Sequence, residues 1–215
     1  MRIDKKAAPI LLLLAVSLPF LISFANLKAI AFDINFYEKE FEKYNPEVEN
    51  ATEITRNLLD YLKNKQVGES YIKEFSEEER LHLKEVKNRF QTMFTILEVS
   101  ILAVMVLLVA LYYVDKKKFL GNIAAFFMLK GFGMIIIGLF FIYSYIRFEE
   151  AFTRFHQTLL FGQWQFSPGS KLVTLFPAQF FIDITKRLFI NTLIIAAIVL
   201  GIGLMFYYLN KKLKL

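Results

Sequence analysis

The sequence contains no cysteine, only one tryptophan and only two histidines, His82 and His156. Without cysteine the chain has no disulfide, no thiolate nucleophile and no thiolate metal site. Any chemistry that needs an imidazole must use one or both of the two histidines. The Gly-x-Ser-x-Gly turn of many serine hydrolases and a glycine-rich phosphate loop are also absent. The sequence therefore excludes cysteine-based catalysis and does not favour a serine hydrolase or a nucleotide-binding enzyme.

Long apolar runs are what the sequence has in excess. Hydrophobic residues make up 56% of the 215 residues, against roughly 45–50% in soluble domains. Four runs carry almost no charge, and about 20 apolar residues are enough for a helix to cross a bilayer. This pattern excludes a soluble globular enzyme and a disordered chain. We predict an all-α membrane protein with four transmembrane helices, at about residues 7–25, 92–114, 124–146 and 188–208.

The basic residues are unevenly distributed between the segments that join these runs. Lysine and arginine cluster before the first run, between the second and third, and after the fourth. Segment 33–91 instead holds 10 basic and 14 acidic residues, and segment 148–186 holds 3 of each. By the positive-inside rule both termini are cytoplasmic, and these two segments form a small, mostly helical extracytoplasmic cap on one polytopic domain, residues 1–215. The net charge of +6 then reflects membrane orientation and does not require a nucleic-acid partner.

The first apolar run has a second interpretation, as a signal peptide cleaved after Ala29-Ile30-Ala31. The length of the run, and Lys28 just before that site, favour a retained membrane anchor. Pro9 and Pro19 are expected to end or kink its helix.

Two charged residues lie inside the predicted spans. We expect Lys130 to extend toward the cytoplasmic face. Glu98 either accepts a hydrogen bond inside the helix bundle or serves a site on the outer side.

The first outer segment has the periodicity of three helices. Residues 33–44 and 50–65 form two of them, and the third begins after Ser76 and continues through Phe90 into the second span. Asn50 with Glu53, and Ser76 with Glu79, have the spacing of N-terminal capping boxes.

The second outer segment is rich in aromatic residues. Such a load would expose a large apolar patch unless it packs on the first outer segment or lies among the lipid headgroups. It forms either a slot for acyl chains or the core of the cap. The residues concerned are Phe152, Phe155, Phe161, Trp164, Phe166, Phe176, Phe180 and Phe181.

The two histidines lie at similar distances from the predicted membrane surface. His82 comes about ten residues before the second span and His156 about ten after the third, a helical rise of about 15 Å in each case. A shared site follows if the two outer segments pack together. A zinc site would need a third ligand such as Glu78, Glu79 or Glu85, but no His-Glu-x-x-His spacing exists. General acid–base catalysis on a lipid-linked substrate, without metal or cofactor, suits a histidine pair better.

Several segments resemble the lipoprotein intramolecular transacylase family, and the four-span layout and loop order resemble it as well. Glu85 stands where aspartate is expected, and Gly162-Gln163 differs from an asparagine-containing version in some members. The segments that carry the resemblance are Asn57–Leu62, Glu79–Lys87, Phe155-His156, Phe161-Gly162-Gln163-Trp164, Leu175-Phe176-Pro177 and Phe180–Asp183.

The resemblance implies a bacterial plasma-membrane enzyme whose partners are the bilayer and diacylglyceryl-modified lipoproteins, with the active site on the outer face. It would move the sn-2 acyl chain of the lipid onto the α-amino group of the N-terminal cysteine, giving the lyso form. The nucleophile then belongs to the substrate. Two readings compete with this one: a non-enzymatic outer-face binding or assembly protein, and a metal-assisted lipid hydrolase.

Under this implied reaction the site residues take separate roles. His82 and His156 are the acid–base pair, in either order, and Glu85 orients His82. The side chains of Arg89 and Arg154, or the Trp164 indole N–H, stabilise the oxyanion. The acyl chains lie against Phe155, Phe161, Trp164, Phe176 and Phe180.

Overall fold

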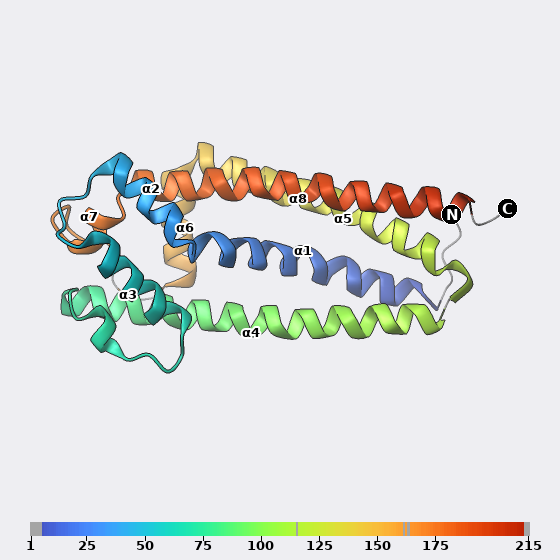
Figure 1. Cartoon of the computed structure of the whole chain (residues 1–215), viewed down its shortest axis with the longest axis horizontal. Coiled ribbons are helices and arrows are strands. Elements are labelled where there is room, and N and C mark those ends of the chain that lie inside the picture. The colour runs from blue at the N-terminus through green and yellow to red at the C-terminus, as the bar shows by residue number, and fades with distance from the viewer. Residues whose placement is uncertain (1–5, 115, 161, 163, 213–215) are drawn as a thin grey trace. The chain divides into compact units, whose positions relative to one another are not determined.

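The computed structural model describes residues 6–114, 116–160, 162 and 164–212, and within them the chain is helical with no strand (Figure 1). The elements are α1 (Ala8–Ala31), α2 (Ile34–Tyr44), α3 (Ala51–Lys63), the 3-10 turn η1 (Glu69–Ile72), α4 (Glu77–Val114), η2 (Lys116–Lys118), α5 (Phe119–Ile146), α6 (Phe148–Leu159), α7 (Lys171–Leu175) and α8 (Ala178–Lys212). Four of them, α1, α4, α5 and α8, are long and apolar enough to cross a membrane. The expected all-helical class with four candidate spans is therefore confirmed.

The chain divides into two compact units. The bundle unit contains Met1–Asn26, Ile96–Phe141 and Leu188–Leu215, and the loop unit contains Leu27–Thr95 and Ile142–Arg187. All four long helices therefore have residues in both units.

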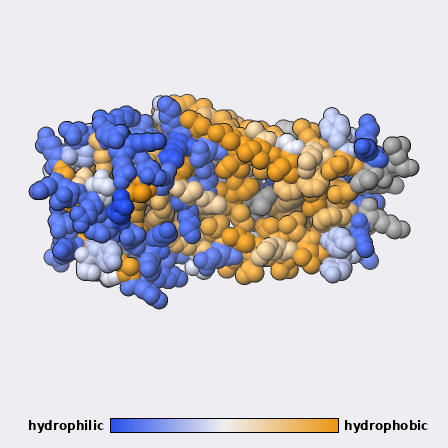
Figure 2. Space-filling view, viewed as in Figure 1, coloured by the Kyte–Doolittle hydropathy of each residue, from blue (hydrophilic) through white to orange (hydrophobic). Residues whose placement is uncertain are grey.

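In the bundle unit the four helices pack around a narrow apolar core. Leu14 of α1, Leu111 of α4 and Phe126 of α5 are buried in it, and Phe206 of α8 packs against it. The outward-facing side chains over these helices are largely hydrophobic (Figure 2), and Val106 and Ile136 are 64% and 69% exposed. A helical surface that is apolar on both its inner and outer sides is typical of a segment surrounded by lipid.

Helices α5 and α8 approach each other closely at glycines. A Cβ atom built on Gly203 would lie 2.8 Å from the backbone nitrogen of Met128, and one built on Gly138 would lie 3.2 Å from Leu193 Cδ2. Small residues are common where membrane helices pack, because they let the backbones come together without an apolar driving force.

Polar side chains also join α1 to α8 in this unit. The amide nitrogen of Asn26 lies 3.3 Å from Thr192 Oγ1, and Asn191 donates to Asn26 Oδ1 at 3.4 Å. Helix α1 continues through Pro19, so of the two expected effects of proline, an end or a kink, the first does not occur there.

The two charged residues predicted inside the spans differ in exposure. Lys130 is only 3% exposed, and its Nζ lies 5.7 Å from the centroid of the Phe126 ring. Glu98 is exposed, and this exposure contradicts the hydrogen bond inside the bundle that was one of its two expected roles.

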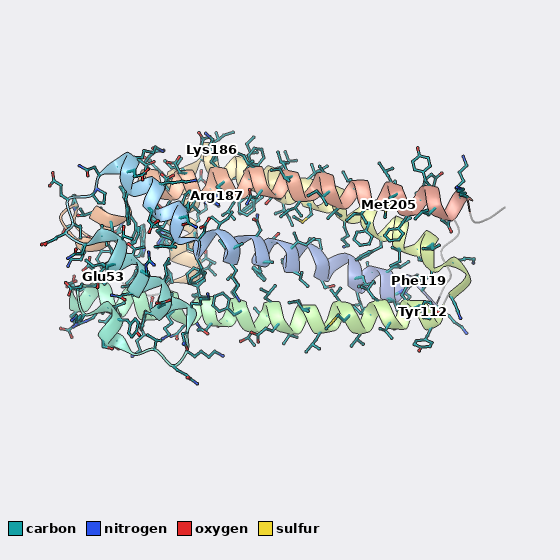
Figure 3. The ribbon with its side chains drawn as sticks, viewed as in Figure 1. Glu53, Tyr112, Phe119, Lys186, Arg187 and Met205 are labelled. Atoms are coloured by element: carbon teal, nitrogen blue, oxygen red, sulfur yellow. The ribbon has the colours of Figure 1, made fainter. Side chains whose placement is uncertain are left out.

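Aromatic residues gather at the lysine-rich turn between α4 and α5. The rings of Tyr112 and Phe119 meet edge to face at 5.3 Å, and Lys116 Nζ lies 5.6 Å from the Tyr112 ring centroid (Figure 3). Tyrosine and lysine together are characteristic of a membrane–water interface.

The loop unit has its own aromatic core. Phe36 and Tyr37 of α2 lie 5.7 and 5.9 Å, ring to ring, from Phe180 and Phe176 respectively. The buried side chains of α3, including Leu58, complete this core. Of the two placements that the sequence left open for the aromatic residues of segment 148–186, Phe176 and Phe180 adopt the packing on segment 33–91.

Polar contacts fix the ends of the elements in the loop unit. Arg187 of α8, labelled in Figure 3, pairs with Asp33 at 2.7 Å, immediately before α2. The Ser76 capping box forms as predicted, with Glu79 N donating to Ser76 Oγ at 3.3 Å and Ser76 N donating to the Glu79 carboxylate at 2.8 Å. Asn50 makes no side-chain cap because its backbone adopts a left-handed conformation, with φ of 56°, so that half of the capping prediction is wrong.

Candidate active site

The two histidines of the chain face each other within the loop unit. His82 lies in the second turn of α4 and His156 in the last turns of α6. Their ring centroids are 6.1 Å apart, and the ring planes are inclined by 14°. Segments separated by more than 70 residues therefore bring together the two imidazoles that the sequence contains, as the spacing of the histidines predicted.

His156 is enclosed by aromatic rings and is 8% exposed. Its ring centroid lies 4.8 Å from that of Trp164, with planes inclined by 30°, and 4.1 Å from that of Phe152. Its Nδ1 lies 2.8 Å from the carbonyl oxygen of Phe152, one turn earlier in α6. Because a carbonyl can only accept, Nδ1 carries the hydrogen in this contact, and in the neutral ring Nε2 keeps the basic lone pair.

Burial lowers the pKa of His156 below its ordinary value, and the hydrogen bond to the Phe152 carbonyl opposes this only in part. The ring is therefore neutral at pH 7 and available as a base. In the unfolded chain the same imidazole takes up a proton as the pH falls through about 6.5. The free energy of unfolding therefore falls as the pH drops below about 6.5, since the unfolded state binds the proton first.

We expect histidine-selective isotope labelling to yield two imidazole spin systems, of which His156 titrates below pH 6.5. Replacing Trp164 by alanine admits water to the ring and should move this midpoint upward, toward the ordinary value near 6.5. NMR titration of the wild type and of Trp164→Ala measures the His156 midpoint in each protein, and His82→Gln assigns the signals. A His156 midpoint at or above 6.5 in the wild type would contradict the dry environment described for this ring.

Two carboxylates on α4 flank His82, and each accepts a hydrogen bond from the backbone of segment 148–186. Glu79, which is 2% exposed, accepts from Leu172 N at 2.8 Å, in addition to its bond from Ser76 N. Glu85 accepts from Gly162 N at 3.1 Å. A Cβ atom on Gly162 would come within 2.9 Å of the Glu85 carboxylate. These contacts were not foreseen, since the resemblance only implied that Glu85 orients His82.

The other predicted site residues divide into those beside the histidines and those away from them. Phe155 lies 5.4 Å from His156, ring to ring, and is 54% exposed. Phe166, named in the sequence only as part of the aromatic load, meets His82 edge to face at 5.4 Å. Phe176 and Phe180 belong to the aromatic core shared with α2, so their packing role is structural. Phe161 lies outside the residues that the structure describes.

The two arginines that were predicted to stabilise an oxyanion are both exposed. The guanidinium of Arg154 is 2.7 Å from the carboxylate of Glu150. Trp164, the third candidate, contacts His156 ring to ring at 4.8 Å. Across residues 6–114, 116–160, 162 and 164–212, no group of three or more His, Asp or Glu side chains is arranged to hold a metal ion.

Comparison with known proteins gives one consistent family. The family model described as lipoprotein intramolecular transacylase Lit matches residues 10–181. The structure of the membrane integral lipoprotein intramolecular transacylase Lit from Bacillus cereus is 22% identical, with a TM-score of 0.73 over 97% of this chain and 95% of that one. Two structures of the same protein with a histidine replaced, by arginine or by alanine, have TM-scores of 0.71 and 0.69 at 20% and 21% identity, covering 97% and 96% of this chain and 92% and 93% of theirs. No curated protein matches the sequence.

Proposed function

This chain belongs to the lipoprotein intramolecular transacylase family, and we propose that His82 and His156 perform the acid–base chemistry of its acyl transfer. The protein is a membrane-integral acyltransferase that acts on lipoproteins. The observation that carries the proposal is the facing pair of imidazoles, 6.1 Å apart. The loop unit around the pair contains no cysteine, and its histidines suit a reaction in which the substrate brings its own nucleophile.

The proposed reaction takes place within one substrate molecule. The α-amino nitrogen of the lipidated N-terminal cysteine attacks the sn-2 ester carbonyl of the attached diacylglycerol. A C–N bond forms, the C–O bond to glycerol breaks, and the proton that leaves nitrogen is matched by the proton that glycerol oxygen receives. Attack closes a ring of about eight atoms, which forms slowly in a free chain, so fixing the two ends together supplies much of the acceleration.

The two imidazoles take different parts in this scheme. An α-amino group has a pKa near 8 and is mostly protonated at neutral pH, so a base must accept its proton. His156 suits that role because its Nδ1–H is committed to the Phe152 carbonyl, which leaves Nε2 as the basic atom. His82, whose ring centroid lies 6.1 Å from that of His156, protonates the departing glycerol oxygen. The Trp164 indole N–H is the proposed donor to the tetrahedral oxyanion.

The exposed side of α6 is the proposed seat of the acyl chains. Phe155 and Leu159 lie one turn apart on it and are 54% and 40% exposed, next to His156. Phe161 and Trp164 extend this set in the sequence. We place the loop unit outside the cell and both termini in the cytoplasm. Lysine and arginine cluster before the first span, between the second and third, and after the fourth, and such clusters mark the cytoplasmic side.

A crossover experiment tests the reaction. Two diacylglyceryl lipopeptides, one isotopically labelled in its acyl chains and the other in its peptide, are mixed with the protein in vesicles and examined by mass spectrometry. The proposed reaction yields N-acyl, monoacylglyceryl products of unchanged mass, with no exchange of labels between the two peptides. Loss of an acyl chain, prevented by a chelator, would identify a metal-assisted hydrolase instead. Unmodified lipopeptides in the presence of inserted protein would favour a binding protein.

A further inference from the structure

The segment that follows α6 is attached to α4 at two points, one on each side of His82. Glu79, His82 and Glu85 are spaced by three residues and lie along one side of α4. Glu79 accepts the N–H of Leu172, and Glu85 accepts the N–H of Gly162. We call the described residues between these two bonds, Gly162 and Trp164–Leu172, the strap.

The strap carries two of the aromatic rings that touch the histidines. Trp164 stacks on His156 at 4.8 Å, and Phe166 meets His82 edge to face at 5.4 Å. Each imidazole therefore has one packing partner whose position depends on the strap.

Different contacts hold the two ends of the strap. Near Leu172 the buried Glu79 is joined by an ion pair between Lys171 and Glu74 at 3.4 Å, and Leu175, 1% exposed, enters the aromatic core. At the other end the exposed Gly162 donates to Glu85. The Glu85 carboxylate therefore acts at the end of the strap that is nearer to Trp164 in the sequence.

Gly162 also fits the carboxylate sterically. A side chain there would meet the Glu85 oxygens at 2.9 and 3.1 Å. Because these atoms are the far end of a flexible side chain, an alanine could be accommodated if the carboxylate moves away. Gly162→Ala therefore breaks the attachment while leaving the rest of the fold undisturbed.

We propose that Glu85 is a positioning residue: its carboxylate fixes the strap at Gly162 and so keeps Trp164 stacked on His156. The inference rests on the proposed function of the two histidines, and it differs from the sequence-based expectation that Glu85 acts directly on His82. A direct effect needs the negative charge, whereas the attachment needs only an acceptor oxygen. Glutamine retains the acceptor and removes the charge, so Glu85→Gln separates the two roles.

The test uses the full-length protein in vesicles and compares Glu85→Ala, Glu85→Gln and Gly162→Ala with wild type. Gly169→Ala is the matched control, because a Cβ on this second strap glycine meets nothing within 4 Å. Turnover of a diacylglyceryl lipopeptide is measured together with acrylamide quenching of Trp164, the one tryptophan of the chain. Size-exclusion chromatography and a thermal melt verify that each variant is folded.

Glu85→Ala and Gly162→Ala should lower kcat by about 10- to 100-fold, the range that a misplacement near 1 Å produces, with KM little changed. Both variants should also expose Trp164 to quencher. Glu85→Gln should recover most of the turnover and protection that Glu85→Ala loses, and Gly169→Ala should match wild type. The proposal is overturned if Glu85→Ala and Gly162→Ala leave kcat and quenching unchanged. It is also overturned if Glu85→Gln loses as much turnover as Glu85→Ala while Trp164 stays protected. If the wild type itself lacks transacylation, the proposed function fails. The comparison of Trp164 quenching among the variants still tests the attachment of the strap in that case.

Discussion

Replacing His156 by alanine is expected to abolish acyl transfer, with a loss of about 10²–10⁴-fold in kcat, the usual contribution of a positioned general base. The variant loses the Nε2 lone pair that accepts the amine proton. His156→Gln should lose as much, since its amide keeps a polar group of similar reach but cannot take up the proton. Conversion of a reporter lipopeptide, followed by mass spectrometry in single-turnover conditions, measures the effect.

The second histidine supplies a sharper form of the same experiment. His82→Ala should lower kcat to a similar level. The double variant should lose little more, because the effects of removing groups that act as one unit are not additive. Gln157→Ala is the control for insertion and folding, since this exposed neighbour of His156 in α6 lies outside the proposed machinery. Wild-type turnover in either single histidine variant would eliminate the pair as the acid–base catalysts.

Substituting Gly203 by alanine is expected to destabilise the bundle unit strongly, and the same change at Gly201 is not. The added Cβ at residue 203 would lie 2.8 Å from the Met128 backbone nitrogen, so the α5 and α8 backbones must separate. Overpacking of this kind costs about 1–3 kcal/mol. At Gly201 the added Cβ meets nothing within 4 Å, and alanine should stabilise the helix there by roughly 0.5–1 kcal/mol.

The two glycine variants thus move stability in opposite directions on the same helix, two residues apart. Both variants are heated in the same detergent, and the fraction that still elutes as a monodisperse peak in size-exclusion chromatography gives the melting temperature of each. Equal melting temperatures for the two variants would show that α5 and α8 have room to separate at Gly203 without cost.

Helical periodicity and charge made much of the fold predictable from sequence. The apolar runs identified four helices, and the Ser76 capping box forms with the expected reciprocal bonds. The sequence was less informative where the backbone, rather than a side chain, decides the contact. Asn50 has the composition of a cap, but its left-handed backbone turns the side chain away from that role.

The meeting of the two histidines was predictable from the sequence, whereas the connections around them were not. With two histidines in the chain, and each about ten residues from a span, their meeting followed from the packing of two segments. The bonds from Leu172 and Gly162 to Glu79 and Glu85 were not foreseen, because backbone N–H groups are present at nearly every residue and leave no compositional signal. Phe176 and Phe180, which were expected at the acyl chains, pack in the aromatic core, since composition cannot say which way an aromatic side chain points.

The exposed Phe155 and Leu159 beside the buried His156 have a consequence for how the enzyme meets its substrate. An apolar helix face next to a reactive group suits a substrate whose acyl chains stay in an apolar phase and never cross water. The concentration that governs turnover is then a two-dimensional one, the mole fraction of lipoprotein in the membrane. Diluting the vesicles would leave the rate per enzyme unchanged, whereas diluting the substrate with inert lipid would lower it.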